Sequence, residues 1–308
     1  MIAVVAGGVG AARYLAGLVQ VVEPTEVTAI VNTGDDTTLH GLRVCPDLDT
    51  ITYTLAGAIN PETGWGLTGE TWRAMGALDR YDPGRSWFRL GDADIGTHLF
   101  RTGRLAEGAG LADVTAEITA AWGLRLRLLP MTEEPVATRF TVEDEGEISF
   151  QEYFVHRAHS VAVTGVRFDG AESARPGPGV LGTLTGVDTI VVAPSNPIVS
   201  IGPVLAVPGV RAALEARRDD VVAVSPIIAG ATVKGPADRL MAELGHEPSV
   251  VGVARLYAPF AGTLVVDDAD AASAPAVEAA GVRCVVAPTL MTGPPEAAAL
   301  ARTTLEGR

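Results

Sequence analysis

Cysteine and lysine are scarce in this chain. Two cysteines, Cys45 and Cys284, occur in 308 residues, which is too few for a disulfide framework and suits a reducing compartment. Lys234 is the only lysine, so the other basic residues are all arginines. No basic cluster is visible, and the formal net charge of −14 repels nucleic-acid backbones. The sequence therefore argues against a nucleic acid as a partner.

Long hydrophobic runs are absent too. The apolar stretches are short and interrupted by Gly or Pro, and none approaches the ~18 residues that span a bilayer. Residues 1–5 carry no basic region or cleavage site, so we interpret them as a strand and not as a signal peptide. Hydrophobic residues make up 47% of the chain and charged residues 19%, which is ample for a buried core. We expect a cytoplasmic globular protein without a membrane partner.

Strand and helix patterns alternate near both ends of the chain. An apolar run at residues 2–6 precedes a helical pattern at 11–22 and a second apolar run at 27–32. Further apolar runs, separated by helical stretches, lie at 188–193, 220–225, 262–267 and 282–287. Continuous apolar runs are typical of parallel strands that are covered on both faces. We predict an α/β fold with a doubly wound, mainly parallel, Rossmann-like sheet.

The middle of the chain departs from this alternation. Residues 47–123 look mainly helical and hold all four tryptophans, whereas residues 124–167 have strand patterns. We predict that residues 1–308 form a single α/β domain in which 47–167 is inserted as a largely helical subdomain. Open α/β sheets bind ligands outside the carboxyl ends of their strands. Because the insertion leaves the sheet at that edge, we expect it to form one side of a ligand site.

A glycine-rich loop joins the first predicted strand to the first helix. Glycines let backbone N–H groups approach an anion, and a helix N-terminus favours negative charge. No Gly-Lys-Ser/Thr follows, so the loop is not a Walker A motif. It is also a poor dinucleotide fingerprint, since Arg13 replaces the third glycine and the second strand ends in Asn32, where an acid is expected. The loop predicts either a phosphate site or a simple tight turn. The residues predicted to contact nucleotide or phosphate here are Gly7, Gly8, Gly10, Arg13, Asn32 and Thr33.

Four carboxylates follow the second predicted strand. Asp35 and Asp36 come directly after it, and Asp47 and Asp49 stand at the start of a helical pattern. Mg²⁺ prefers one or two carboxylates together with phosphate oxygens and water, so this acidic edge predicts a magnesium site with Asp49 and Asp36 as ligands. The alternative is helix capping. We interpret Asp47 as the N-cap of a helix over 50–55, and both interpretations stay open for Asp49.

A second acidic segment follows Arg89. Asp92 suits the N-cap of a helix that begins at about Ile95. Asp94 and His98 share one face of that helix, and we interpret them as a surface pair. Arg89 either clamps a phosphate bidentately or is a surface arginine. The five histidines show no metal-ligand spacing, so we expect no zinc site.

Two consecutive strand ends in the C-terminal half carry polar residues. Ser195 and Asn196 follow one predicted strand, and Ser225 follows the next. Hydroxyls, amides and backbone donors at neighbouring strand ends predict a nucleotide cradle. The alternative is a pair of ordinary turns that use turn-prone residues. No Ser-His-Asp or Cys-His arrangement for covalent catalysis is visible.

Seven short motifs resemble one known family when they are taken together. They are Ala6-Gly7-Gly8-Val9-Gly10, Asn32-Thr33-Gly34-Asp35-Asp36, Pro46-Asp47-Leu48-Asp49-Thr50, Gly91-Asp92-Ala93-Asp94 with Thr97-His98, Ala193-Pro194-Ser195-Asn196-Pro197, Ser225-Pro226-Ile227-Ile228 and Leu290-Met291-Thr292. In this order, over nearly the whole chain, they resemble the 2-phospho-L-lactate transferase family of coenzyme F-420 biosynthesis. The arginine-rich, lysine-poor composition resembles actinobacterial members, which favours the phosphoenolpyruvate type.

The resemblance implies a reaction and a set of substrates. A guanosine diphosphate-linked donor carries lactate or enolpyruvate, the acceptor is the terminal ribityl hydroxyl of 7,8-didemethyl-8-hydroxy-5-deazariboflavin, and GMP leaves. Mg²⁺ neutralises the diphosphate. Asp49 and Arg89 match positions that contact the deazaflavin, with Trp65 as a stacking candidate, and Asp49 and Asp47 are the catalytic candidates. We also expect a homodimer, and from the topology of the sheet we expect the insertion to form the acceptor-binding side.

A protein of another class is the chief alternative. A non-catalytic nucleotide-sugar-binding regulator of a related fold uses the same glycine loop and strand-end loops. Such a sensor has no need of the insertion, which carries Asp47, Asp49, Trp65 and Arg89, and this favours the enzyme. An NAD-dependent oxidoreductase is disfavoured by Arg13 and Asn32.

Overall fold

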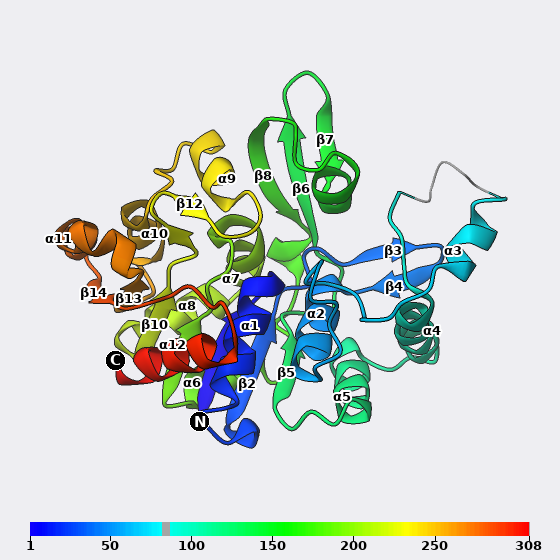
Figure 1. The fold of residues 1–308 in the computed structure, drawn as a ribbon, viewed down its shortest axis with the longest axis horizontal. Coiled ribbons are helices and arrows are strands. Elements are labelled where there is room, and N and C mark those ends of the chain that lie inside the picture. The colour runs from blue at the N-terminus through cyan, green and yellow to red at the C-terminus, as the bar shows by residue number, and fades with distance from the viewer. Residues whose placement is uncertain (82–86, 308) are drawn as a thin grey trace.

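The computed structural model describes residues 1–81 and 87–307. Within them lies a seven-stranded sheet with the order β14-β13-β10-β9-β1-β2-β5, in which all neighbouring strands are parallel. The strands are β1 (Ile2–Ala6), β2 (Val27–Val31), β5 (Arg127–Pro130), β9 (Thr189–Val192), β10 (Val221–Val224), β13 (Thr263–Val266) and β14 (Arg283–Val286). From β1 the chain adds β2 and β5 on one side and then returns to build the other side (Figure 1). This order confirms the predicted doubly wound fold and makes β1 and β9 the switch point.

Helices cover both faces of the sheet. One face carries α1 (Gly8–Leu18), α2 (Pro46–Leu55), α5 (Leu111–Ala121) and α12 (Pro294–Glu306), with α1 in contact with both α2 and α12. The other face carries α6 (Val180–Gly186), α7 (Gly202–Ala206), α8 (Val210–Glu215), α10 (Val250–Tyr257) and α11 (Ala274–Ala279). Strand β1 serves both cores, since Val4 packs on the first face and Val5 on the second, as the two-residue period of a strand requires. No helix in the described ranges is long and apolar enough to cross a membrane.

The middle of the chain is divided, where the sequence predicted one insertion over 47–167. Helix α2 covers the main sheet and β5 is its edge strand, so both belong to the α/β core. Outside the core lie the hairpin β3 (Thr37–Leu39) and β4 (Leu42–Val44), with α3 (Arg73–Leu78) and α4 (Asp92–Ala106). A second excursion forms a three-stranded sheet from β6 (Ala137–Val142), β7 (Gly146–Ser149) and β8 (Val163–Asp169), and β7 and β8 are linked through a π-helix at Glu152–His156. Figure 1 shows the β6–β8 sheet extending to the top and the hairpin with α3 and α4 extending to the right.

Two predicted helix caps are wrong. Helix α2 begins at Pro46 with Cys45 as its N-cap residue, so Asp47 lies inside the first turn and its carboxylate is free for other contacts. Proline suits this first position because its missing N–H has no partner there and its φ is already helical. Helix α4 begins at Asp92 itself, after Gly91. The Asp92 carboxylate instead accepts the N–H groups of Arg73 and Ala74 at the start of α3.

Candidate active site

A cavity of about 940 Å³ opens at the carboxyl edge of the sheet. It lies beyond the ends of β1, β9 and β10, at the switch point where doubly wound folds bind ligands. Both excursions from the core contribute residues to its wall. The loops that follow the sheet strands supply further lining residues. The predicted site residues that line it are Gly7, Gly8, Gly10, Arg13, Asp47, Asp49, Trp65, Arg89, Ser195, Asn196 and Ser225. The predicted residues Asn32, Thr33 and Asp36 are not part of its lining.

The glycine loop forms the floor of the cavity where β1 meets α1. Gly8 has a φ of 71°, which favours glycine. A Cβ on Gly10 would lie 2.1 Å from the carbonyl oxygen of Pro194, so a larger residue cannot fit between α1 and the loop after β9. The turn therefore explains Gly8, and the close packing explains Gly10. The predicted contact of this backbone with a phosphate stays a prediction.

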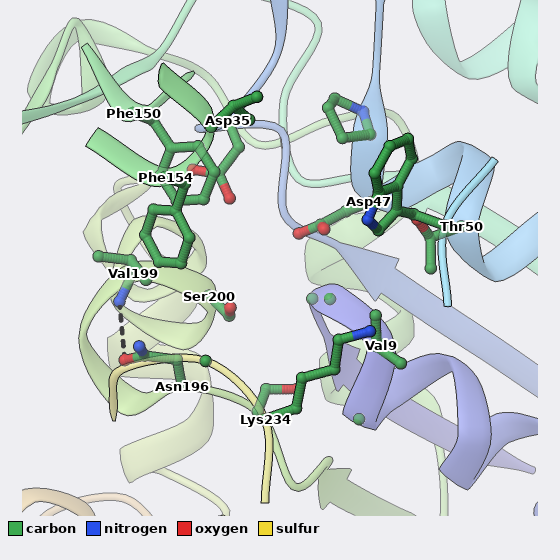
Figure 2. Close-up of a pocket in the computed structure, with 18 of the residues that line it drawn as sticks. Val9, Asp35, Asp47, Thr50, Phe150, Phe154, Asn196, Val199, Ser200 and Lys234 are labelled. Atoms are coloured by element: carbon green, nitrogen blue, oxygen red, sulfur yellow. Dashed lines mark hydrogen bonds between the residues drawn. The ribbon is translucent and has the colours of Figure 1, made fainter. Parts of the chain in front are cut away.

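Asn32 organises one group of carboxylates, which we term the Asn32 group (Asn32, Asp35 and Asp47). Its side-chain amide donates to Asp35 Oδ2 and to Asp47 Oδ2, each at 3.0 Å, and its oxygen accepts the N–H of Gly34 at 2.8 Å. Asn32 is completely buried, whereas both carboxylates reach the cavity. The asparagine that ends β2 thus ties this strand to the first turn of α2. Figure 2 shows Asp35 beside Phe150 and Asp47 beside Thr50.

The charges of the Asn32 group are not balanced by a cation of the described chain. Burial and the nearby Asp47 raise the pKa of Asp35 well above its ordinary value. Burial raises the pKa of Asp47 to about 6, although Asn32 and the backbone of Gly8 stabilise its carboxylate. Asp35 Oδ1 is buried and accepts no hydrogen bond of good geometry among the described residues, although the nearby Thr138 hydroxyl acts to lower the pKa of Asp35. Two carboxylates that share a neutral amide and face a cavity form a site that favours a cation.

A second group of charges lies beside the first, and we term it the Arg101 group (Asp49, Asp94, His98 and Arg101). Arg101 is 1% exposed, and its two terminal nitrogens donate to the two oxygens of Asp49, with Nη1 3.1 Å from Oδ2. Arg101 Nη1 also lies 3.2 Å from His98 Nδ1. A guanidinium only donates, so Nδ1 accepts and the Nε2 proton of His98 faces Asp94 Oδ2, 3.1 Å away. The fork of Arg101 therefore sets the orientation of Asp49 at the cavity wall.

The prediction of Asp94 and His98 as a surface pair is wrong. His98 is 1% exposed and both residues line the cavity. Burial raises the pKa of Asp94, but His98 and the Tyr53 hydroxyl, 2.7 Å away, lower it more. Arg101 was missed at the sequence level. The signal was its spacing, since positions 94, 98 and 101 share one face of α4.

Aromatic side chains form the wall on the side of the excursions. Trp65, Trp72 and Trp87 line the cavity, and the Arg89 guanidinium lies 5.6 Å from the centre of the Trp72 ring. Trp122 instead packs against Tyr53. Phe150 and Phe154, which the sequence analysis did not single out, stack with ring centroids 4.3 Å apart and also line the cavity (Figure 2). This wall suits a flat ring system.

The polar loops after β9 and β10 meet at the cavity as predicted, but their side chains also serve as turn residues. Asn196 Oδ1 accepts the N–H groups of Ile198 and Val199, at 2.9 and 3.3 Å, and both contacts cap the helix that begins at Pro197. Ser225 Oγ accepts the N–H of Ile227 at 3.1 Å. Ser195 Oγ is buried and has no hydrogen-bond partner in the described part of the chain. Ser195 thus keeps its hydroxyl for a ligand, whereas the other two side chains shape the loops.

Asp36 lies apart from the cavity. Its carboxylate accepts from Arg43 Nη2 at 2.9 Å, and burial raises the pKa of Asp36 to about 6 against the opposing effect of Arg43. Over residues 1–81 and 87–307, no cluster of three or more His, Cys, Asp or Glu side chains is arranged to hold a metal by itself. The geometry therefore gives no support to Asp36 and Asp49 as joint ligands of one magnesium ion. A magnesium ion in this cavity would need other carboxylates as its ligands.

Comparisons with known proteins identify the family of the chain. The family model described as 2-phospho-L-lactate transferase CofD matches residues 2–283. A phosphoenolpyruvate transferase of Streptomyces griseus subsp. griseus is 47% identical over 311 residues, covering 99% of this chain and 97% of that protein. A protein of the same name from Kitasatospora aureofaciens is 45% identical over 309 residues, covering 99% of this chain and 96% of that protein. The solved structure of BH3568 from Bacillus halodurans shares the fold, with a TM-score of 0.65, 17% identity and coverage of 99% and 98% of the two chains. The resemblance seen in the sequence is confirmed, and the chain belongs to the 2-phospho-L-lactate transferase CofD family.

Proposed function

We propose that this transferase moves a phosphoenolpyruvyl or 2-phospholactyl group from a guanosine diphosphate-linked donor to the ribityl hydroxyl of the deazariboflavin, in coenzyme F-420 biosynthesis. The name that the actinobacterial relatives carry favours the phosphoenolpyruvyl group. In the proposed step, the acceptor oxygen attacks the phosphorus atom that carries the enolpyruvyl or lactyl group. The bond from that phosphorus to the bridging oxygen breaks, the hydroxyl proton is lost, and GMP leaves.

The observation that carries this proposal is the division of the cavity into two unlike walls. The glycine loop, the N-terminus of α1 and Arg13 form a wall suited to phosphate. The aromatic wall, with Arg89 over Trp72, is suited to a tricyclic ring. The carboxylates of Asp35, Asp47 and Asp49 line the same cavity. Phosphoryl transfer depends on positioning and on charge neutralisation more than on a covalent nucleophile, which such a cavity provides.

In this proposal Asp49 orients the acceptor. Its carboxylate is fixed by the fork of Arg101 and lines the cavity. An ionised carboxylate accepts a hydrogen bond from the ribityl hydroxyl and so directs the oxygen lone pair toward the donor. Arg89 and Trp65 would hold the ring of the same molecule. Ser195 and the backbone of the glycine loop would hold the nucleotide.

The Asn32 group fits the magnesium ion that the family implies. Asp35 and Asp47 offer hard oxygen ligands, their mutual repulsion contributes to the raised pKa of Asp35, and Asp35 Oδ1 accepts no hydrogen bond of good geometry among the described residues. Asp49, in contrast, already has both oxygens on Arg101. We therefore propose Asp35 and Asp47, in place of Asp36 and Asp49, as the ligands. When bound, Mg²⁺ would neutralise charge on the diphosphate and its leaving oxygen.

One assay tests the reaction. The protein is incubated with deazariboflavin, Mg²⁺ and each of the two donors, and GMP and the product mass are measured. We expect GMP and a product that carries the transferred phosphate ester, and none of either when a donor or the acceptor is left out. Tight binding of GDP without GMP release from either donor would contradict the proposal and favour the nucleotide-binding regulator.

A further inference from the structure

Lys234, the only lysine of the sequence, lines the cavity. The hairpin of β11 (Ile227–Ile228) and β12 (Ala231–Thr232) leads into a loop that ends at α9 (Ala237–Glu243), and Lys234 lies in this loop. Thr232 Oγ1 is within hydrogen-bonding distance of the Gly235 carbonyl oxygen and of Asp238 Oδ1, at 2.6 and 2.8 Å. These contacts fold the backbone tightly on both sides of Lys234. The loop therefore presents this side chain from an ordered support.

The Lys234 side chain reaches from the nucleotide side of the cavity to the other side. Its amino group donates to the carbonyl oxygen of Thr63. A Cβ on the neighbouring Gly64 would lie 2.7 Å from Lys234 Nζ and 3.4 Å from Val9 Cγ1. The ammonium group is thus close to the glycine loop that begins α1. Figure 2 shows Lys234 extending from its loop toward Val9.

The charge around Lys234 is positive. Partial burial and the guanidinium of Arg13 lower the pKa of Lys234. Its amino group donates a hydrogen bond to a neutral carbonyl oxygen, and among the described residues no carboxylate forms an ion pair with it. Two cations of the same cavity wall therefore lie close together beside a helix N-terminus, where negative charge is favoured.

We propose that Lys234, together with Arg13, binds the diphosphate of the donor nucleotide and positions it over the glycine loop. This inference rests on the proposed function and deepens it, because it names the side chain that contacts the donor phosphates. A charge-assisted bond to a phosphate oxygen is stronger than the present bond to the Thr63 carbonyl, so the ammonium exchanges one acceptor for the other when the donor binds. The sequence analysis had assigned Lys234 no role.

Nucleotide titrations distinguish this role from a purely structural link to Thr63. Lys234→Met should weaken GDP binding about ten-fold or more, since a charged hydrogen bond is lost. It should weaken GMP binding less and leave guanosine binding unchanged. Lys234→Arg should restore most of the GDP affinity. Arg302→Gln removes one positive charge outside the cavity lining and serves as the matched control, with GDP affinity as in the wild type.

Chemical labelling gives a second readout on the unaltered protein. Lys234 is the only lysine of the sequence, and protein expressed to begin at Met1 carries one further primary amine there, so acetylation by an active ester followed by peptide mass spectrometry reports on both. GDP and inorganic pyrophosphate should slow the acetylation of Lys234 and not that of Met1, which is the internal control. If pyrophosphate protects Lys234 and GDP does not bind the protein at all, the anion site stands and the proposed function, with its guanosine diphosphate-linked donor, is wrong. If GDP binds the wild type and Lys234→Met equally, or binds without protecting Lys234, the inference is overturned.

Discussion

The two groups of carboxylates at the cavity have the same residue type and similar burial, yet their charges are compensated differently. In the Arg101 group, Asp49 meets a buried guanidinium that binds both of its oxygens. In the Asn32 group, Asp35 and Asp47 share one neutral amide. Removing ions from water costs several kcal/mol each unless a partner compensates. The first group carries its own cation and is suited to orienting a substrate, whereas the second requires a cation from outside.

The largest effect on stability is expected from breaking the Arg101 group. Arg101→Met leaves Asp49 buried without its partner, so the free energy of unfolding should fall by about 3–5 kcal/mol. Chemical denaturation measures this loss. Arg104→Met on the same helix is the matched control, because Arg104 pairs with Glu107 and Glu117 at the surface and exposed pairs contribute little. If both substitutions lowered the free energy of unfolding equally, the buried ion pair would contribute no more to stability than the exposed one, which would contradict this prediction.

Asparagine substitutions separate the two groups by the sign of their effects. Asp35→Asn and Asp49→Asn should each reduce turnover by roughly two orders of magnitude, as expected when a key electrostatic stabiliser is lost. In metal-free protein, however, Asp35→Asn should raise the melting temperature by relieving repulsion from Asp47, and Asp49→Asn should lower it. Steady-state kinetics and thermal denaturation in EDTA check both parts. Melting temperatures that fall alike in both variants would contradict the comparison.

The stability of the metal-free protein should depend on pH through Asp47. The pKa of Asp47 is about 6 in the folded chain, above its ordinary value of 3.8, so the folded state binds the proton more tightly than the unfolded state. Stability is therefore lost as the pH rises from about 4 to 6, by up to about 3 kcal/mol. Asp47→Asn should reduce the slope in this range without abolishing it, because burial raises the pKa of Asp36 to about 6 as well. Denaturation at several pH values in EDTA measures the slope, and an unchanged slope in the variant would assign the titration elsewhere.

The smallest effect is expected at the aromatic wall. Arg89→Ala removes the guanidinium that lies over Trp72, and it should weaken deazaflavin binding by about 1–3 kcal/mol while GDP binding stays the same. Deazaflavin fluorescence and calorimetry measure the two affinities. A loss of GDP affinity with intact deazaflavin affinity would show that the two walls have been assigned the wrong way round.

The features that could be predicted from the sequence are those made locally. Apolar runs gave the parallel strands of the sheet, and the glycine loop and the polar loops after β9 and β10 did reach one cavity, because the carboxyl ends of parallel strands share an edge. The cap prediction for Asp47 failed although Pro46 carried the correct signal, since proline favours the first helical position.

Features made by distant segments could not be predicted in the same way. Asp92 caps α3 and not its own helix, and Glu70 accepts the N–H groups of Ala93 and Asp94 in return. Asn32 joins two carboxylates from separate segments, which no local pattern indicates. Arg101 lies 52 residues from Asp49 in the chain, so their pairing depends on how α4 docks against α2.

Magnesium titration tests the central comparison most directly. Calorimetry would measure Mg²⁺ binding in the presence of GDP for the wild type, Asp35→Asn and Asp49→Asn. The account predicts that Asp35→Asn abolishes measurable Mg²⁺ binding and that Asp49→Asn keeps it within a few-fold of the wild type. Loss of binding in Asp49→Asn with wild-type binding in Asp35→Asn would contradict the account and place the ion on the Arg101 group.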